Sequence, residues 1–337
     1  MRPDRFAVLV TGGAGYIGSH AVLALLEAGW PVVVLDNLVT GFRWAVDRRA
    51  RFVKGDAGDR ELVPALIESE GIGAILHFAG SVVVPESVAD PLKYYRNNTA
   101  TTGALLESAV ACGVRHLVFS STAAVYGDAP SVRVDERMTP SPINPYGRSK
   151  LMIEAMLADV AAAHPLNYCA LRYFNVAGAD PLARCGQSTL GATHLIKVAV
   201  EAALGTRDGI DVFGTDFATP DGTGVRDYIH VTDLAQAHVH ALDLLIAGPG
   251  ESHTMNCGYG RGFSVLEVLA AVERASGQAI ARRFLPRRPG DPGALIADNG
   301  LIRACTAWQP RHAELDAIVG HALRWERILT ERQMAIG

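Results

Sequence analysis

Tyr146 and Lys150 are four residues apart in the segment NPYGRSK, at the start of a predicted helix over residues 146–163. Residues with this spacing face the same side of a helix. A free tyrosine has a pKa of about 10, and a lysine ammonium one turn away, or an oxidised nicotinamide nearby, favours the phenolate. Tyr146 is therefore a candidate general base. Because Tyr-x-x-x-Lys also occurs on solvated helix faces, this interpretation depends on the neighbouring segments.

Hydroxyl side chains precede this pair in the segment FSSTAAVYG. Ser120, Ser121 and Thr122 end a predicted strand, so we expect them at the same sheet edge as Tyr146. Their presence there, beside the glycine loop described next, favours a catalytic pair over a solvated helix face.

A glycine-rich loop near the start of the chain indicates a nucleotide partner for this chemistry. The segment VTGGAGYIGSH follows a predicted strand and opens a predicted helix, and Gly13, Gly15 and Gly18 satisfy the dinucleotide-binding pattern G-x-G-x-x-G. The free N–H groups of the helix N-terminus attract a pyrophosphate. Asp36 ends the next strand, 18 residues after Gly18, where a carboxylate accepts hydrogen bonds from the ribose hydroxyls and repels a 2′-phosphate. The loop therefore predicts NAD rather than NADP; a structural turn with a solvated Asp36 is the alternative.

Short apolar strands alternate with helices around these residues, which indicates a parallel sheet covered on both faces. We predict an α/β fold with a doubly wound Rossmann-type parallel sheet and a smaller C-terminal α/β lobe for the substrate. The predicted strands cover residues 6–12, 31–37, 51–56, 74–80, 116–122 and 167–175, and the predicted helices cover residues 16–28, 98–111 and 146–163.

The alternation weakens after about residue 176, where loop-rich segments begin. We predict an NAD-binding Rossmann domain over residues 1–175, completed by 226–250, and a substrate lobe formed by 176–225 and 251–337. This lobe is expected to supply loops over the C-terminal edge of the sheet, where open α/β sheets bind ligands.

One helix of the smaller lobe is predicted over residues 263–277, where Ser264 and Glu267 form a capping box. The GYGRG segment before it is glycine-rich too. We interpret it as a connection into that helix and not as a second dinucleotide loop.

Composition limits the remaining possibilities. The chain has 337 residues, 49% apolar and 20% charged, with a formal net charge of −4 and no long basic run, so nucleic acid is not an expected partner. No signal peptide and no apolar run of about 18 residues is present, so no membrane span is expected. The five cysteines are odd in number and lack C-x-x-C, which predicts buried thiols in a reducing cytoplasm, without a disulfide framework or a metal site.

Nine segments spread over essentially the whole chain resemble the extended short-chain dehydrogenase/reductases, and most closely the UDP-glucose 4-epimerases. They are VTGGAGYIGSH, LDNL, HFAG, YYRNNT, FSSTAAVYG, NPYGRSK, LRYFNVAGADP, DGTGVRDYIHV and RRPGD.

The resemblance implies a reversible epimerisation at C4 of a UDP-hexose, UDP-galactose to UDP-glucose. Tyr146 would remove the 4-hydroxyl proton while the C4 hydride passes to tightly held NAD. The 4-keto sugar then turns about its link to the diphosphate, and hydride returns to the opposite face. Thr122 would hydrogen-bond the reacting oxygen, and Lys150 would lower the pKa of Tyr146 and hold the nicotinamide ribose.

The resemblance also implies a cofactor site, in which Asp56 meets the adenine edge and Asn98 lies beside the nicotinamide; a helix cap is the alternative for Asn98. The implied cofactor-binding residues are Gly12, Gly15, Tyr16, Ile17, Gly18, Asp36, Asn37, Asp56, Ala57, Phe78, Ala79, Gly80, Asn98, Ser120, Tyr146, Lys150 and Tyr173.

At the nucleotide-sugar end, arginines would hold the two phosphates, an aspartate the uridine ribose and a phenylalanine the uracil. The implied substrate-binding residues are Thr122, Tyr146, Asn175, His194, Leu195, Phe213, Arg226, Tyr228, Arg288, Asp291 and Leu295. An ion pair with Asp227 is the alternative for Arg226, and a surface ion pair is the preferred interpretation of Arg287.

Two positions depart from the family pattern. Val82 stands where many members have a lysine that touches the cofactor phosphates. Leu295 stands at the position that limits sugar size, so UDP-N-acetylhexosamines remain open as alternative substrates.

Other functions known for related folds fit the sequence less well. A sugar-nucleotide 4,6-dehydratase needs an acidic pair after Thr122, where this chain has Ala123 and Ala124. A decarboxylase or a 5-epimerase fits the DGTGVRDYIHV and RRPGD segments less well. An NAD-binding sensor predicts a broken Tyr/Lys pair, but both residues are present.

The predicted helices over 98–111 and 146–163 are apolar on more than one face. Because the family commonly forms homodimers through two such helices per chain, we expect a homodimer. A monomer with a thick helical layer is the alternative.

Overall fold

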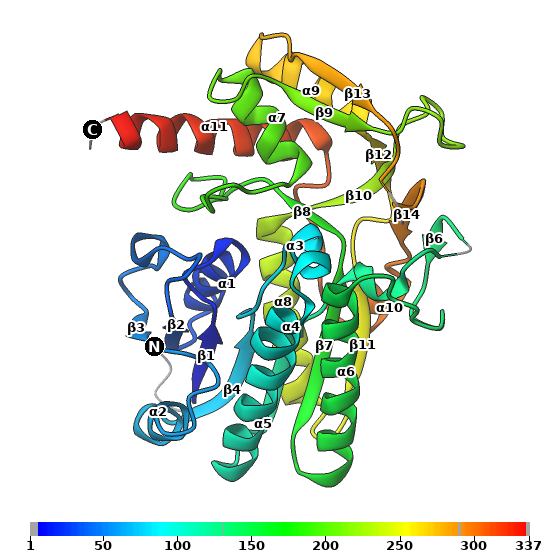
Figure 1. Cartoon of the computed structure of the whole chain (residues 1–337). Coiled ribbons are helices and arrows are strands. Elements are labelled where there is room, and N and C mark those ends of the chain that lie inside the picture. The colour runs from blue at the N-terminus through cyan, green and yellow to red at the C-terminus, as the bar shows by residue number, and fades with distance from the viewer. Residues whose placement is uncertain (1–5, 130, 289–290, 335–337) are drawn as a thin grey trace.

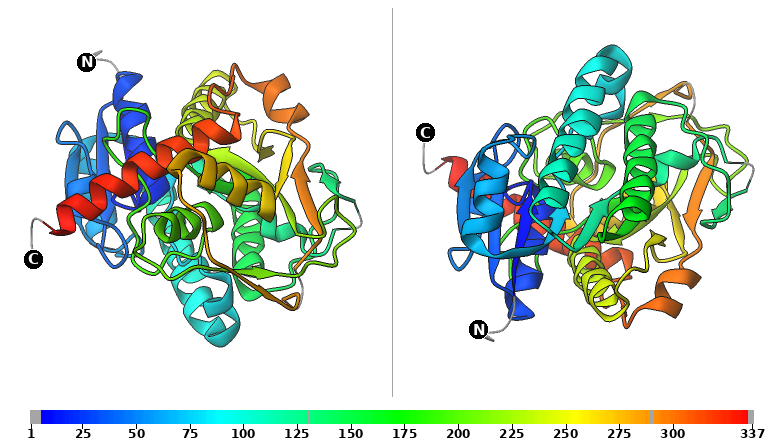
Figure 2. Two further views of the ribbon diagram at one scale, coloured as in Figure 1. Left: turned by 90° about the horizontal axis from the view of Figure 1, so that it is seen from above. Right: turned by 90° about the horizontal axis from the view of Figure 1, so that it is seen from below.

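The computed structural model describes residues 6–129, 131–288 and 291–334, with side chains described as far as residue 331. The chain forms two lobes, and the smaller lobe lies over one edge of the main sheet (Figure 1). The two further views show that helices cover both faces of this sheet (Figure 2). No helix in the described ranges is long and apolar enough to cross a membrane.

The main sheet has seven strands in the order β11-β7-β5-β4-β1-β2-β3, and every neighbouring pair is parallel. The strand order reverses between β1 and β4, which is where open α/β sheets bind ligands. The doubly wound fold predicted from the sequence is thus confirmed. The strands are β1 (Ala7–Thr11), β2 (Val32–Asp36), β3 (Arg51–Lys54), β4 (Ile72–His77), β5 (His116–Ser120), β7 (Asn167–Tyr173) and β11 (His253–Cys257).

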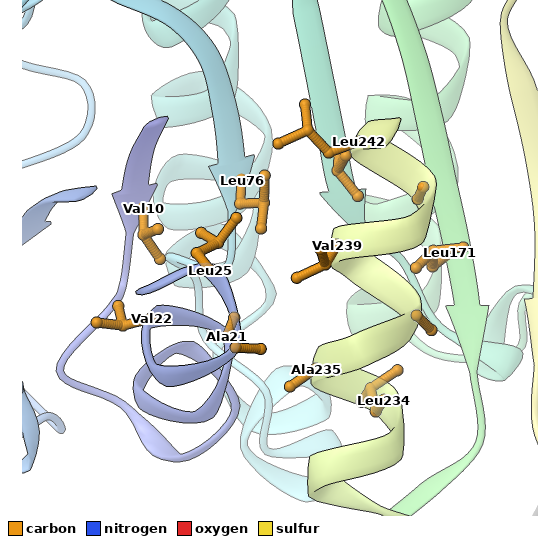
Figure 3. Packing of buried hydrophobic residues seen from close by; sticks show 14 of the residues in the cluster. Val10, Ala21, Val22, Leu25, Leu76, Leu171, Leu234, Ala235, Val239 and Leu242 are labelled. Carbon is orange, nitrogen blue, oxygen red and sulfur yellow. The ribbon is translucent and has the colours of Figure 1, made fainter. Parts of the chain in front are cut away.

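Helices bury the apolar side chains of both sheet faces. On one face, α1 (Tyr16–Glu27) and α8 (Val231–Ala247) pack over Val10 and Leu76 (Figure 3). On the other face the covering helices are α2 (Leu62–Glu70), α5 (Thr101–Ala111) and α6 (Pro145–Ala163). Burial on both faces explains why the strands are continuously apolar and do not alternate.

The helical run before α5 is longer than predicted. It contains α3 (Val84–Ala89), α4 (Pro91–Tyr94) and a π-helical turn (Tyr95–Ala100). Such turns are rare and frequently occur at functional sites.

The smaller lobe has a five-stranded sheet, a separate two-stranded sheet and its own core. Its described elements are β6 (Arg133–Val134), β8 (Asn175–Ala177), β9 (Ile210–Phe213), β10 (Val225–His230), β12 (Gly262–Ser264), β13 (Arg282–Leu285), β14 (Ala294–Ala297), α7 (Leu195–Ala203), α9 (Val265–Ser276) and α11 (Leu315–Met334). The helix α10 (Gly300–Cys305) packs instead against β11, and its Ile302 belongs to the core of the main sheet. The capping box predicted for α9 is present, because the Ser264 hydroxyl accepts from the Glu267 N–H while the Glu267 carboxylate accepts from the Ser264 N–H.

Two strands, β10 and β11, lie in other lobes than the predicted domain boundaries place them in. β11 was expected in the substrate lobe but pairs with β7 at the edge of the main sheet. β10 was expected to complete the Rossmann domain, but it pairs with β8, β12 and β14 in the smaller sheet. The reason is that α8 connects the two sheets: β10 of the smaller sheet comes directly before it in the chain, and β11 of the main sheet directly after it.

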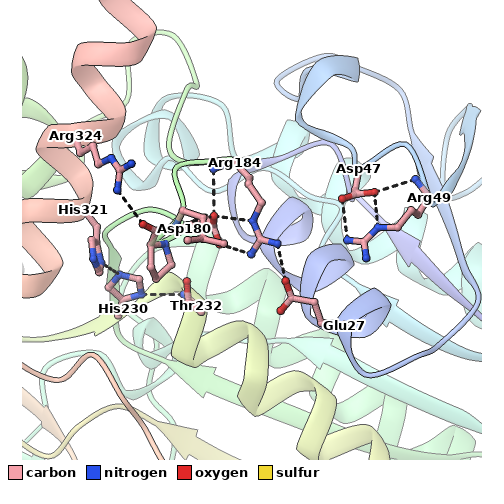
Figure 4. A network of polar contacts seen from close by, with 11 residues as sticks. Glu27, Asp47, Arg49, Asp180, Arg184, His230, Thr232, His321 and Arg324 are labelled. Carbon is pink, nitrogen blue, oxygen red and sulfur yellow. Dashed lines mark hydrogen bonds and ion pairs between the residues drawn. The ribbon is translucent and has the colours of Figure 1, made fainter.

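Polar contacts join the two lobes. Arg184 pairs with Asp180 at 2.6 Å and reaches Glu27 of α1 at 2.6 Å (Figure 4). His230, the N-cap of α8, lies 3.0 Å from the ring nitrogen of His321 on α11. These contacts fix the smaller lobe beside the glycine loop.

Candidate active site

The glycine loop has no room for side chains. Gly12 has φ +71°, and a Cβ built there would lie 2.6 Å from the backbone nitrogen of Ala79. A Cβ on Gly18 would lie 2.2 Å from the Gly12 carbonyl oxygen. Gly15 is the N-cap of α1 and no side chain caps this helix. The N–H groups of its first turn therefore face an open cradle that fits a pyrophosphate.

Asp36 lies at the end of β2 and ties the loop to the strand. Its two carboxylate oxygens accept hydrogen bonds from the Ala14 N–H at 2.9 Å and the Leu38 N–H at 2.8 Å. A carboxylate has about four acceptor positions, so further acceptor capacity remains for ribose hydroxyls. Leu38 has φ +62°, a strained conformation that these bonds stabilise.

The residues predicted to meet the adenine lie next to Asp36 and contact one another. Asn37 donates to Asp56 at 3.3 Å, and Asp56 in turn accepts from the Gly58 N–H at 2.8 Å. Ala57 between them is buried.

Replacing Asp36 with asparagine tests this cofactor assignment. We expect the affinity for NAD to fall about 10- to 100-fold, the effect of about 1.5–3 kcal/mol for a hydrogen bond to a charged group. The preference for NAD over NADP should fall too, because the charge that repels a 2′-phosphate is gone. Calorimetric titration of both nucleotides measures the effect, with Asp47→Asn as the control, since Asp47 pairs with Arg49 on the surface. Unchanged discrimination between the nucleotides would contradict the assignment.

Tyr146 occupies the first turn of α6. This turn begins because Asn144 accepts a hydrogen bond from the Gly147 N–H at 2.9 Å and Pro145 follows it. The Tyr146 ring is buried and makes an edge-to-face contact with the Tyr94 ring, with centroids 6.3 Å apart. Burial raises the pKa of Tyr146, and the hydrogen bond with Thr122 acts in the opposite direction. The role expected for Lys150 in lowering this pKa stays a prediction.

Lys150 lies one turn further along α6, on the same helix face. Its ammonium donates to the Ser120 carbonyl oxygen at 2.9 Å and lies 4.8 Å from the centre of the Phe119 ring. Burial lowers the pKa of Lys150 to about 8, and the Glu154 carboxylate acts in the opposite direction.

The strand end after β5 presents the predicted hydroxyls. Thr122 accepts from the Ala124 N–H at 3.1 Å and caps a short 3-10 turn (Ala123–Tyr126). The Ser120 and Tyr173 hydroxyls are hydrogen-bonded to one another.

Asn98 is not a helix cap, which corrects the alternative considered for it. It lies buried within the π-helical turn, where its side-chain oxygen accepts from the Ser81 N–H at 2.7 Å and its amide donates to Ser149 at 3.0 Å. A Cβ on Gly80 would lie 2.9 Å from this oxygen and 3.9 Å from the Lys150 nitrogen. Asn98 therefore joins the segment after β4 to α6.

Further residues predicted around the cofactor cradle lie at the start of α1 and in the segment after β4. Tyr16 reaches across to the smaller lobe and donates to the Gly178 carbonyl at 2.7 Å. Ile17 and Phe78 pack against the core cluster beneath α1. Val82, at the position where the family often has lysine, is exposed.

The predicted phosphate-binding arginines have partners in the structure. Arg226 forms an ion pair with Asp291, so the alternative pairing with Asp227 is wrong. Asp227 is fully buried and accepts from the Tyr259 N–H at 3.0 Å and the Gly260 N–H at 2.8 Å. The Arg288 guanidinium lies 4.0 Å from the centre of the Phe213 ring.

Arg287 pairs with Asp216 at 2.7 Å, which confirms the surface ion pair preferred for it. Pro289 and Gly290 of the RRPGD segment lie outside the described residues.

The other predicted substrate residues are dispersed. Asn175 is exposed at the start of β8, and His194 is the exposed N-cap of α7, which Leu195 begins. Leu295 is buried on β14, in register with Arg226 on β10. Tyr228 is buried in the core cluster of the smaller lobe.

Sequence reasoning missed two residues, one beside Tyr146 and one beside Lys150. The Tyr94 hydroxyl lies 2.6 Å from the Val83 carbonyl oxygen, which fixes the ring against Tyr146. The other is His77, whose ring nitrogens lie 2.6 Å from the Thr11 hydroxyl and 2.8 Å from the Thr102 hydroxyl. Burial lowers the pKa of His77 to about 3, so the ring is neutral beside Lys150. Tyr94 falls in the YYRNNT segment and His77 in HFAG, so a motif signal existed for both.

A Rossmann sheet with a glycine cradle, an acidic residue ending β2 and a Tyr/Lys pair at the same sheet edge defines a nicotinamide-dependent enzyme of the short-chain dehydrogenase/reductase class. More particularly, the chain belongs to the NAD dependent epimerase/dehydratase family, which matches residues 8–258. It is an NAD-dependent epimerase.

Individual relatives support this assignment. A UDP-glucose 4-epimerase from Azospirillum brasilense is 55% identical over 96% of this chain and 93% of its own length. A UDP-glucose 4-epimerase structure from Stenotrophomonas maltophila, with bound NAD and formylated UDP-arabinopyranose, is 40% identical, with a TM-score of 0.94 over 97% of this chain and all of the other. The enzyme from Bifidobacterium longum in complex with NAD+ and UDP is 37% identical, with a TM-score of 0.90 over 96% of this chain and 98% of the other.

Proposed function

We propose that this chain interconverts UDP-galactose and UDP-glucose by reversible epimerisation at C4. The observation that carries the proposal is the convergence of Tyr146, Thr122 and Lys150 at the sheet edge beside the glycine cradle. The segment after β4 makes the connection, because Ala79 touches Gly12 and the neighbouring Gly80 lies beside Lys150.

Tyr146 is the proton-transfer group in this proposal. It accepts the proton of the sugar 4-hydroxyl and later returns it to the 4-keto oxygen. Burial favours the phenol, which gives the proton back, while the hydrogen bond with Thr122 favours the phenolate, which takes it. Because the Thr122 oxygen is the acceptor in the bond with Ala124, its one hydroxyl proton is directed to Tyr146 in the free enzyme and would turn to the reacting oxygen when the sugar is bound. NAD, when bound, supplies the hydride acceptor and donor for C4.

The chain's own groups would hold the cofactor at both ends. The first turn of α1 and Asp36 bind the pyrophosphate and the adenosine ribose. Lys150 and Asn98 lie at the nicotinamide end, where Lys150 would hold the nicotinamide ribose.

The smaller lobe is proposed to bind the nucleotide of the substrate. Arg226 and Arg288 hold the two phosphates, Asp291 the uridine ribose and Phe213 the uracil. Substrate binding then requires the Arg226–Asp291 pair and the Arg288–Phe213 stack to exchange partners for the nucleotide. Both arginines are planar donors suited to phosphate.

The methyl side chains after Thr122 argue against a dehydratase. Ala123 and Ala124 form the first turn of the 3-10 segment and carry no group that could transfer a proton. Elimination of water from the sugar therefore has no acid there.

Leu295 is proposed to set the width of the sugar pocket. It shares a buried cluster with Ala123, the residue after Thr122, so its side chain lies close to the reacting position.

The first experiment is incubation of the purified chain with UDP-galactose, without added NAD, followed by chromatography of the products. UDP-glucose formation supports 4-epimerisation with a retained cofactor. A parallel incubation with UDP-N-acetylgalactosamine tests whether Leu295 restricts the pocket. No turnover of either sugar after NAD is supplied would refute the proposal.

We propose a homodimer, in a chain that we place in the cytoplasm. Of the two helices predicted to form it, over 98–111 and 146–163, the proposed surface keeps α6 and adds α3 and α4, where exposed apolar side chains lie. Val88, Leu92 and Met152 expose 64%, 63% and 46% of their surface there. Apolar residues gathered on one face are typical of an interface.

Replacing Leu92 with aspartate is expected to weaken this dimer about 30-fold or more, the effect of about 2 kcal/mol at a central interface position. Light scattering after gel filtration over a dilution series measures the change. Leu182→Asp is the control, because Leu182 is 70% exposed but lies in a loop of the smaller lobe. Equal molar masses for the two variants at every concentration would refute the interface.

A further inference from the structure

A third ionisable residue follows Tyr146 and Lys150 on the same face of α6. Glu154 lies one helical turn beyond Lys150 and is buried with Arg172 of β7. The pair is bidentate, with Arg172 Nε 3.0 Å from Glu154 Oε1 and Nη2 2.6 Å from Oε2. Breaking a buried pair of this kind is strongly unfavourable, so its geometry is fixed.

The Glu154 carboxylate also reaches the strand end that carries the catalytic hydroxyl. The Ser121 hydroxyl donates to Glu154 Oε1. Ser121 lies between Ser120, whose carbonyl receives the Lys150 ammonium, and Thr122. One carboxylate therefore links α6, β7 and the segment after β5.

The network continues from Arg172 to the smaller lobe. Arg172 donates to the Tyr126 hydroxyl at 3.1 Å, and this hydroxyl donates to the side-chain oxygen of Asn256 at 2.7 Å. Asn256 donates to the Val134 carbonyl at 2.9 Å. Val134 belongs to β6, which pairs with β14, the strand that carries Leu295. The chain of bonds thus connects the catalytic helix with the proposed sugar pocket.

We propose that Glu154, clamped by Arg172, is a positioning residue of the reaction: it holds the Ser120–Thr122 strand end against α6 and places a carboxylate one helical turn from the Lys150 ammonium. The inference deepens the proposed epimerase function and rests on it.

The charges around Lys150 give the direction of the effect. Burial lowers the pKa of Lys150 to about 8 and the Glu154 carboxylate raises it. The other titratable groups that face this region are Tyr146 on α6, Tyr94 on α4, neutral His77 on β4, and Tyr173 and Arg172 on β7. Lys150 is charged below its pKa and loses its proton as the pH rises through it. Without the Glu154 charge, this loss begins at a lower pH.

Lys150 can be observed directly, because the chain has four lysines, Lys54, Lys93, Lys150 and Lys197. NMR of side-chain-labelled lysine in the NAD-loaded protein therefore gives its titration without any turnover. We expect the Lys150 titration in Glu154→Gln to move down by about one pH unit, and the alkaline limb of kcat for UDP-galactose to move with it. Arg172→Met should move the titration up, because it leaves the carboxylate uncompensated.

The opposite signs separate positioning from a merely structural role, which would lower activity in both variants without moving the titration. If a single variant fails to fold, Glu154→Gln/Arg172→Met removes both charges, and its Lys150 titration is still expected below that of the wild type. Lys197→Met/Glu326→Gln is the matched control, a buried ion pair between α7 and α11 whose loss should leave Lys150 unmoved. An unshifted Lys150 titration in a folded Glu154 variant would overturn the inference. Absence of turnover in the wild type would refute only the proposed substrate, because the NMR readout does not need turnover.

Discussion

Tyr146→Phe is expected to lower kcat for UDP-galactose epimerisation by about 10²–10⁴-fold, the usual contribution of a general acid–base group. The substitution removes only the phenolic oxygen. The ring keeps its buried position and its edge-to-face contact with Tyr94, so the fold and the cofactor content should be those of the wild type. Initial rates at saturating substrate, together with the NAD content of the purified protein, measure the effect.

Tyr168→Phe is the matched control for this prediction. Tyr168 is a partly buried tyrosine near the start of β7, whereas the residues that contact the site lie at the end of that strand. We expect its kcat to stay within about twofold of the wild type, as for a surface change away from the site. A Tyr146→Phe enzyme that retains the activity of this control would exclude Tyr146 as the proton-transfer group.

The large sheet and the placement of Tyr146 and Lys150 on one helix face could be predicted from the sequence because each depends on local patterns. Strands buried on both faces must be continuously apolar, and a glycine loop between a strand and a helix is typical of dinucleotide binding. Tyr146 and Lys150 share a helix face by spacing alone. These features do not require knowledge of distant contacts.

The remaining features depend on residues far apart in the chain. The ion-pair partner of Arg226 is Asp291, 65 residues away. Nothing in the local sequence shows that Arg226 pairs with Asp291 and not with the adjacent Asp227. Asp227 points the other way because neighbouring residues of a strand face opposite sides. β11 could not be assigned to the main sheet because its pairing with β7 is made only after the chain crosses the smaller lobe.

The contacts of the charged groups at the site and their pKa shifts could not be predicted from the sequence either. Spacing places Lys150 beside Tyr146, but it does not show that the ammonium is directed to the Ser120 carbonyl. Burial, which sets the direction of both pKa shifts, depends on the packing of several elements around α6. The residue types at the site were thus predictable from the sequence, whereas the pKa shifts of Tyr146 and Lys150 were not.

Gly18→Ala is expected to weaken NAD binding about 100-fold and to lower the free energy of unfolding by about 1–3 kcal/mol. The added Cβ would lie 2.2 Å from the Gly12 carbonyl oxygen and 2.8 Å from the Gly13 Cα, both of them backbone atoms that cannot rotate away. The glycine loop must therefore move, and the N–H groups of the first turn of α1 lose their alignment with the pyrophosphate. Calorimetric NAD titration and denaturant unfolding of the cofactor-free chain measure the two effects.

Gly320→Ala provides the matched comparison, because Gly320 is also inside a helix but has no atom within 4 Å of an added Cβ. There the alanine should raise the free energy of unfolding by about 0.5–1 kcal/mol, since only the entropy of the unfolded chain changes. NAD affinity should not change. The two variants are expected to change the free energy of unfolding in opposite directions because backbone atoms lie against Gly18, whereas no atom lies near an added Cβ at Gly320. If Gly18→Ala were as stable as Gly320→Ala and bound NAD equally well, the close approach within the loop would not be what holds the cofactor.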